Sequence, residues 1–132
     1  MNPVWNSVFS FLEVDDVKAI HMVQVEKYGG KDGIRERGLL ESAVSMPQAS
    51  FDGEWLHKDV YDQAAAYWFH LIKNHPFFDG NKRVGVATAL VFLEAYGIGT
   101  DYNEDEMYDL VMDTIAGTKS KDDVAAFLRK RQ

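Results

Sequence analysis

Residues 74–83 read NHPFFDGNKR and place a histidine, an acid, a glycine, an asparagine and two cations within ten positions. Helical hydrophobic periodicity is strong on both sides of this segment. Pro76 disfavours helical backbone at His75, so we expect one helix to end there and the chain to turn. A second helix is expected to begin near Asn81. Most of the side chains in this turn suit chemistry better than a hydrophobic core.

The two helices around this turn are indicated by their caps and their apolar residues. Asp59 is expected to cap the first helix, with Asp62 three residues later. Residues 84–97, VGVATALVFLEAYG, are apolar on nearly all sides, which predicts a central buried helix that Gly97 ends. The expected buried stripe of the first helix consists of Tyr61, Ala64, Ala65, Trp68, Leu71 and Ile72.

Helical periodicity also dominates the rest of the chain. Residues 16–30, DVKAIHMVQVEKYGG, form an amphipathic pattern that two glycines end. Residues 36–47, ERGLLESAVSMP, repeat apolar positions at helical spacing until the proline. Two further helices are expected at polar caps, Asn103 with Glu106 and Ser120 with Asp123. The predicted class is mainly α, with about six helices.

One segment is expected to be a β-hairpin. Residues 48–58, QASFDGEWLHK, carry an aromatic residue on either side of Asp52–Gly53, a dipeptide that favours tight hairpin turns. We therefore predict a short hairpin or an exposed loop there.

The composition limits the class of protein. A chain of 132 residues is expected to be one domain, residues 1–132, and is long enough to bury a core without disulfides. The absence of cysteine excludes disulfides, cysteine–zinc sites and a thiol nucleophile. The net charge of −7 argues against broad nucleic-acid binding, which needs a basic surface.

A cytoplasmic protein is expected, with no membrane partner. The longest strongly apolar stretch, residues 84–96, is interrupted by Thr88 and Glu94 and is too short to cross a bilayer. The N-terminus has no basic start and no small-residue cleavage site, so it does not resemble a signal peptide.

Residues 80–83 have the features of an anion site. They are expected in the first turn of a buried helix, where backbone N–H groups have no intrahelical partner and phosphate is the usual ligand. Gly80 would allow close approach to those donors. Arg83 adds a bidentate fork for phosphate oxygens, Lys82 adds a compact charge, and Asn81 can orient the same group.

Asp79 and His75 complete a nucleotide-dependent transfer site. Asp79 has the chemistry for magnesium, which takes one or two carboxylates and completes its shell with water and substrate phosphate. His75 could accept a proton from an attacking hydroxyl near neutral pH. A base, a metal carboxylate and a phosphate cradle together match phosphoryl-type transfer. The P-loop, the GxGxxG loop and the kinase motifs are missing from the sequence.

Each of these residues also has an ordinary structural explanation. A histidine before proline is often a helix end, Asp79–Gly80 is a common turn pair, and a lone arginine is usually a solvated surface group. The residues share no common structural explanation, so their combination favours a functional site.

The segment HPFFDGNKR, residues 75–83, resembles the signature of the Fic/Doc superfamily, HxFx(D/E)(G/A)N(G/K)R. Residues 20–30 and 34–54 are similar to that family's first two helices and the start of its flap. The resemblance covers most of residues 13–130, but only the nine-residue signature is specific. It implies a compact helical core with a β-hairpin flap over the active site.

The resemblance also implies a role for each signature residue. His75 would be the general base that deprotonates a hydroxyl of a target protein, and Asp79 would hold Mg²⁺. The turn at 80–83 would bind the phosphates of ATP, with Arg83 as the main side-chain contact, and Phe77 would anchor the loop. The flap near 48–57 would dock the target as an added strand, and its candidate residues are Phe51, Asp52, Gly53, Glu54 and Trp55.

Position 82 bears on the reaction. Typical Fic enzymes have glycine there and transfer AMP, whereas Lys82 resembles the death-on-curing (Doc) toxins, which phosphorylate a translation factor. Lys82 would place a cation where a phosphate would otherwise lie, so the nucleotide is expected to present its γ-phosphate to His75. Pro76 and Gly80 are more similar to the AMP-transferring branch, so AMP transfer remains an alternative. A non-catalytic helical binding module is a second alternative.

Regulation by a separate antitoxin protein is expected. Self-inhibited relatives carry an (S/T)xxxE(G/N) helix, whose glutamate blocks the signature arginine. Ser50 to Glu54 has the spacing but is followed by Trp55, and the pair Thr100 and Glu104 is followed by aspartate. Neither segment fits the inhibitory motif.

Overall fold

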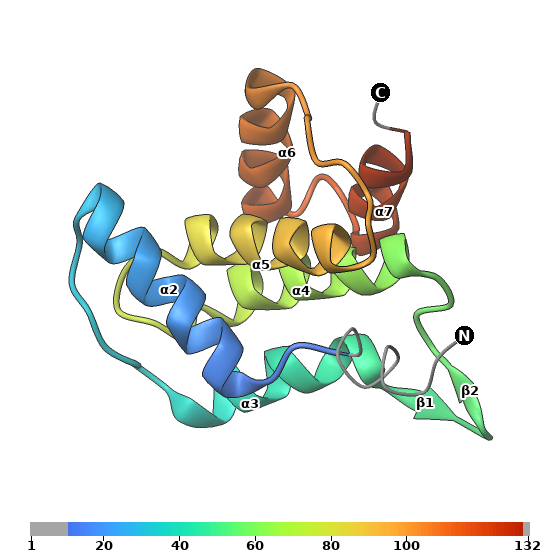
Figure 1. Ribbon diagram of the computed structural model, residues 1–132, viewed down its shortest axis with the longest axis horizontal. Coiled ribbons are helices and arrows are strands. Elements are labelled where there is room, and N and C mark those ends of the chain that lie inside the picture. The colour runs from blue at the N-terminus through green and yellow to red at the C-terminus, as the bar shows by residue number, and fades with distance from the viewer. Residues whose placement is uncertain (1–10, 131–132) are drawn as a thin grey trace.

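The computed structural model describes residues 11–130, and within that part it contains six α-helices, a short 3-10 helix and one hairpin. Its centre is a pair of helices, α4 (Val60–Asn74) and α5 (Asn81–Ala95), which run side by side and are joined by residues 75–80 (Figure 1). The mainly α class is confirmed, with the two central helices at the predicted positions. The outermost residues of the expected single domain, 1–10 and 131–132, lie outside the described part.

The central pair holds most of the hydrophobic core. Trp68 of α4 and Phe92 of α5 are fully buried, and of the predicted α4 stripe only Tyr61 is half-buried rather than buried. Gly85 lets the two helices approach closely. A methyl group added there would lie 2.9 Å from Ile72 Cγ1 and 3.1 Å from the Trp68 carbonyl oxygen.

The other helices pack around this pair (Figure 1). Helix α2 (Val14–Tyr28) lies against α5, and α3 (Arg37–Ser45) with the 3-10 turn η1 (Met46–Gln48) lies against α4. Helix α7 (Lys121–Arg129) packs on α4, while α6 (Glu104–Ala116) stands more steeply above the central pair. None of the helices in the described part is long and apolar enough to cross a membrane.

The polar residues expected to cap helices do so. The Asp62 N–H donates to Asp59 Oδ1 at 2.9 Å, and the Glu106 N–H donates to Asn103 Oδ1 at 2.9 Å. Ser120 closes a capping box with Asp123, as expected. The first helix starts two residues earlier than its apolar pattern suggested, at Val14, where the N–H of the N-cap Glu13 donates to Asp16 Oδ2 at 2.7 Å.

The hairpin consists of β1 (Ser50–Phe51) and β2 (Glu54–Trp55), paired antiparallel in the register Ser50 to Trp55. Both turn residues have positive φ, 55° at Asp52 and 83° at Gly53, which is the backbone of the tight turn that this dipeptide favours. The predicted hairpin is therefore confirmed. Trp55 rests edge-on against Phe11, with ring centroids 5.1 Å apart.

The position of the hairpin differs from the flap that the family resemblance implied. The hairpin precedes the first residue of α4, whereas His75 follows its last residue, and the two lie at opposite ends of this helix (Figure 1). A helix of 15 residues is about 22 Å long. Because α4 is continuous, the hairpin does not cover His75 in this structure.

Candidate active site

The His75 end of the loop is held by an arginine from a distant segment. His75 ends α4 in the left-handed conformation, with φ 54° and ψ 53°, which is uncommon for a non-glycine residue. Arg35 Nε donates to the His75 carbonyl at 2.9 Å, and its Nη2 donates to the Asn74 carbonyl at 3.3 Å. These bonds satisfy carbonyls that the helix end leaves free and keep the His75 side chain exposed.

The residues after His75 pair with the segment between α2 and α3. The Pro76 carbonyl accepts from the Arg35 and Glu36 N–H groups at 2.7 and 3.0 Å. Phe77 forms an isolated antiparallel bridge with Ile34. Residues 33–36 therefore act as a short strand alongside the loop, which fixes its path.

Phe77 anchors the loop, in the position that the resemblance implied. Its side chain is buried, and its ring stacks on the His21 imidazole with centroids 3.8 Å apart and planes 7° from parallel. The Phe77 N–H donates to Asn81 Oδ1, and Asn81 Nδ2 donates to the Phe77 carbonyl, both at 2.9 Å. Two reciprocal bonds and a buried ring hold this residue.

The Asn81 side chain has a different task from the predicted one. We expected it to orient a phosphate, but it is 4% exposed and both ends of its amide bond to Phe77. A side-chain amide can donate and accept at the same time. The Asn81 oxygen and nitrogen are both used in this way to bond the loop back to Phe77. Only the Asn81 backbone N–H, at the start of α5, remains suited to an anion.

Asp79 is held at both its carbonyl and its carboxylate. His21 Nε2 lies 2.7 Å from the Asp79 carbonyl oxygen, and the Lys31 N–H donates to Asp79 Oδ2 at 2.8 Å. The side chain is otherwise exposed. Gly30 packs close beneath it, since a methyl group there would lie 3.3 Å from Asp79 Cβ.

The Asp79 carboxylate suits magnesium better than a metal that needs several protein ligands. Within the described residues, no group of three or more His, Cys, Asp or Glu side chains could hold a metal ion. Mg²⁺ commonly takes one or two carboxylates and fills the rest of its shell with water and substrate phosphate. Asp79 is exposed enough to serve in that way, with one oxygen already oriented by the Lys31 N–H.

The start of α5 has the features that were predicted for an anion site. Gly80 is its N-cap in the left-handed conformation, with φ 80° and ψ 15°. Lys82 and Arg83 follow in the first helical turn and are both exposed, next to N–H groups that no intrahelical carbonyl can satisfy. The Arg83 guanidinium lies over the Tyr28 ring, 4.6 Å from its centroid, so a cation–π contact helps to orient it.

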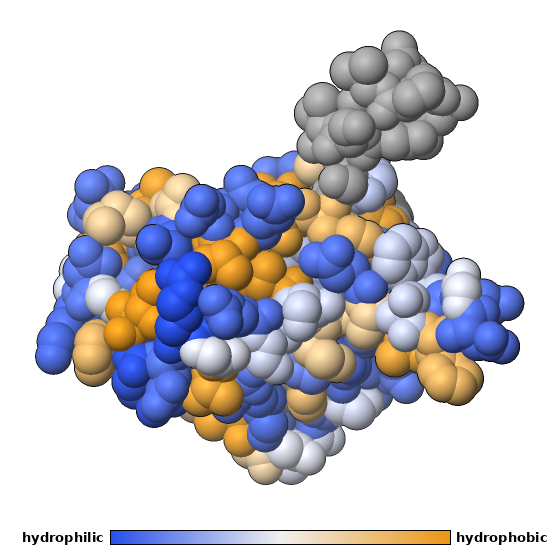
Figure 2. All heavy atoms as spheres, turned by 90° about the horizontal axis from the view of Figure 1, so that it is seen from below, coloured by the Kyte–Doolittle hydropathy of each residue, from blue (hydrophilic) through white to orange (hydrophobic). Residues whose placement is uncertain are grey.

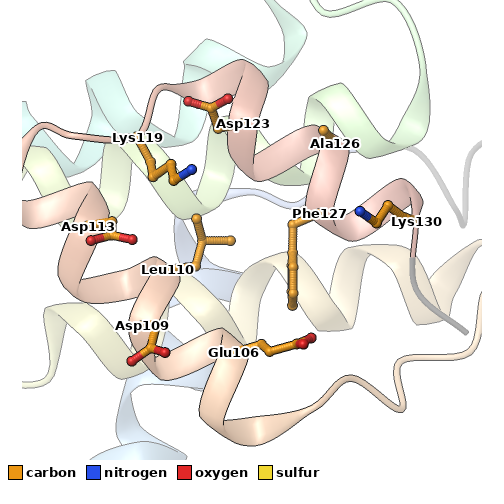
Figure 3. Close-up of a pocket in the computed structure, with 9 residues that line it drawn as sticks. All are labelled: Glu106, Asp109, Leu110, Asp113, Lys119, Asp123, Ala126, Phe127 and Lys130. Atoms are coloured by element: carbon orange, nitrogen blue, oxygen red, sulfur yellow. The ribbon is translucent and has the colours of Figure 1, made fainter.

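Two surface hollows lie away from this loop. One lies between α6 and α7 and is bordered by acids and two lysines around Leu110 and Phe127 (Figure 3). The other, at the hairpin, is lined by Gly53, Glu54, Trp55 and Lys58. Neither includes a residue of 75–83, where the exposed polar side chains are those of His75, Asp79, Lys82 and Arg83.

Several residues that support the site were not assigned to it from sequence. Arg35, the Lys31 N–H and Tyr28 had no sequence signal, because they act through contacts distant in the chain. His21 did have a sequence signal, because it is a polar residue on an apolar helix face. It is hydrogen-bonded, as a buried histidine usually is. His57, which follows the hairpin, is 8% exposed and therefore a poor candidate for contact with a target.

The sequence model of the Fic/DOC family matches residues 11–93, which include the hairpin and the whole loop. The chain therefore belongs to the Fic/DOC family. Toxin Doc of Mycolicibacterium smegmatis is 36% identical to it over 103 residues, covering 76% of this chain and 79% of that protein. Protein kinase doc of Escherichia phage P1 is 29% identical over 116 residues, covering 88% and 90%. The resemblance to the Doc type is thereby confirmed.

Proposed function

We propose that this protein is a Doc-type toxin that transfers the γ-phosphate of ATP to a hydroxyl group of a target protein. The observation that carries the proposal is the single exposed turn that combines His75, Asp79, Lys82 and Arg83. Support also comes from a relative of nearly the same length whose name is Protein kinase doc.

The proposed reaction is a direct displacement at the γ-phosphorus. The target hydroxyl oxygen forms the new P–O bond as the bond to the β-phosphate oxygen breaks, and ADP leaves. His75 takes the hydroxyl proton, which leaves a phosphate ester on the target. Arg35 keeps His75 at the helix end through the His75 carbonyl, so the imidazole projects from a fixed backbone.

The cations of the first α5 turn are proposed to bind the phosphates. Arg83 supplies a bidentate contact oriented by Tyr28, and the free N–H groups add donors. Asp79 would hold Mg²⁺, which when bound neutralises phosphate charge. Lys82 would then exclude the orientation in which the α-phosphate faces His75, which distinguishes the kinase reaction from AMP transfer.

The hairpin is proposed to dock the target at a distance from His75. Phe51, Trp55 and Leu56 are 75%, 46% and 56% exposed, and apolar side chains gather at this end of the molecule (right in Figure 2). An extended target segment would need roughly seven residues to run from the hairpin along α4 to His75. The target is proposed to be a translation factor, as in the Doc toxins that Lys82 resembles.

A separate antitoxin is the proposed regulator. Two relatives bear the Doc name and one is called a toxin. The segments with inhibitory spacing are placed poorly for that role, since Ser50 and Glu54 lie in the hairpin. Co-expression with any small open reading frame that adjoins the gene tests this, with rescue of growth as the expected result.

The test of the reaction is label transfer in a cell lysate, with ATP labelled at the α- or the γ-phosphate. The wild type is compared with His75→Asn, because asparagine tolerates the left-handed backbone at this helix end and isolates the chemistry from the cap. We expect γ label on protein, and about 10²–10⁴-fold less with His75→Asn, the usual contribution of a general base.

Each other outcome selects an alternative. Transfer of α label would make the protein an AMP transferase despite Lys82. Transfer of neither label, with nucleotides and lysates varied, would favour a non-catalytic binding module. Equal γ transfer by His75→Asn would remove His75 from the reaction.

A further inference from the structure

Buried His21 has a place in the site that packing alone does not explain. It lies on α2 and is 2% exposed, on the same face as Val17, which precedes it by one helical turn. Burying a polar ring is unfavourable unless it is hydrogen-bonded, so an aliphatic residue would serve packing equally well. The polar atoms of His21 must therefore be accounted for.

The hydrogen bond of His21 is directed at the metal-binding residue. Nε2 lies 2.7 Å from the Asp79 carbonyl oxygen. A carbonyl oxygen can only accept, so Nε2 carries the hydrogen and donates. The bond joins residues 58 positions apart and fixes the peptide between Asp79 and Gly80, immediately before α5.

The same imidazole forms the floor beneath the loop. It stacks on Phe77 at 3.8 Å, and a methyl group at Gly80 would lie 3.5 Å from Nε2. Its other nitrogen, Nδ1, lies 3.9 Å from Asp32 Oδ1, beyond hydrogen-bond distance. One ring thus touches the loop anchor, the metal carboxylate residue and the N-cap of the anion site.

Asp79 is consequently held from two sides by two different segments. His21 holds its carbonyl, and the Lys31 N–H holds carboxylate oxygen Oδ2. With both ends fixed, the free carboxylate oxygen and the first N–H groups of α5 keep one relative arrangement. Loss of the His21 bond would release the backbone end while leaving the anchor Phe77 and the helix pair in place.

We propose that His21 is a positioning residue for the nucleotide site, which sets the Asp79–Gly80 peptide so that the metal carboxylate and the phosphate-binding turn act together. This inference rests on the proposed function only in treating the loop as a site for Mg²⁺ and ATP. It does not depend on which phosphate is transferred.

The test compares three full-length variants. His21→Phe keeps a flat ring over Phe77 and removes the donor, whereas His21→Gln keeps a donor at similar reach and removes the ring. Val17→Ala is the matched control, because it weakens the core on the same helix face and lies one turn before His21. Calorimetry gives the affinity for Mg²⁺·ATP, thermal unfolding gives the midpoint, and α- and γ-label transfer are measured alongside.

We expect His21→Phe to bind Mg²⁺·ATP roughly 10–100-fold more weakly, the usual effect of losing a residue that orients a metal ligand. His21→Gln should recover most of that affinity. Val17→Ala should lower the unfolding midpoint and leave the affinity unchanged. This pattern separates orientation of Asp79 from stability.

Several results would overturn the inference: unchanged affinity in His21→Phe, equal losses in the Phe and Gln variants, a matching loss in Val17→Ala, or no binding by the wild type. Failure of the proposed function looks different. A wild type that binds Mg²⁺·ATP but transfers only α label would refute the kinase reaction, while the affinities would still decide the role of His21.

Discussion

At the scale of single residues, this site depends on backbone positions that side chains from elsewhere enforce. His75 adopts a left-handed backbone that is uncommon for a non-glycine residue, and Arg35 stabilises it through the His75 carbonyl. Asn81 is used to close the loop, so the exposed polar side chains of the signature are those of His75, Asp79 and the two cations. Each side chain can therefore be assigned to holding the loop or to its exposed surface.

The Lys82 side chain is expected to select the phosphate that is transferred. Lys82→Gly removes both its bulk and its charge, so γ-label transfer should fall about tenfold or more, the value of one contact to a charged group, and α-label transfer should appear. Lys82→Gln keeps the bulk without the charge and should lose γ transfer without gaining α transfer. The two-label assay measures both. Unchanged γ transfer in Lys82→Gly would show that Lys82 does not set the orientation.

At the scale of elements, the site depends on how closely α4 and α5 pack. His75 ends one helix and Asn81 begins the other, so their separation sets the distance between the proposed base and the anion site. Gly85 permits that separation, because a side chain there would meet Ile72 and the Trp68 carbonyl. The helix pair is thus part of the site as well as of the core.

Gly85→Ala is expected to destabilise the protein by roughly 1–3 kcal/mol through overpacking between α4 and α5. The matched control is Gly38→Ala in α3, where a methyl group meets nothing within 4 Å. That change should be stabilising by about 0.5–1 kcal/mol, because alanine favours helix over glycine. Urea unfolding midpoints measure both changes. A Gly85→Ala protein as stable as the wild type would mean that α4 and α5 can move apart without loss of stability.

At the scale of the whole molecule, a part-buried polar contact links α7 to α4. Lys121 Nζ lies 2.9 Å from His70 Nε2, which therefore accepts from the ammonium group as a neutral imidazole. Burial, together with the charge of Lys121 and the proximity of His57, lowers the pKa of His70 to about 4. Folding thus keeps this histidine unprotonated at pH values where an unfolded chain would protonate it.

The stability of the fold is expected to fall in mild acid because of His70. As the pH drops below about 6.5, the unfolded state takes up a proton that the folded state refuses until the pH approaches 4, so the free energy of unfolding decreases over that interval. After allowance for the partial exposure of His70, the free energy of unfolding falls by on the order of 2 kcal/mol. His70→Gln should flatten this part of the curve, measured by urea unfolding between pH 7 and 4. Parallel curves for the two proteins would contradict the prediction.

Local sequence signals were sufficient for most of the secondary structure. Asp59, Asn103 and Ser120 cap helices as predicted, and Asp52–Gly53 makes the predicted turn. These signals act within about four residues, so they can be read along the chain. The combination of a histidine, an acid and two cations in residues 75–83 likewise identified the candidate site and the family before any contact was known.

Only the tertiary structure decided how that site is held and what surrounds it. The bonds from Arg35 to His75 and from His21 to Asp79 join residues 40 and 58 positions apart, a separation over which local propensity carries no information. The inward turn of Asn81 and the place of the hairpin at the far end of α4 follow from packing. The amino-acid sequence by itself thus determined the elements and the reactive groups, whereas packing between distant segments determined their geometry, because that geometry depends on contacts formed only when the helices assemble.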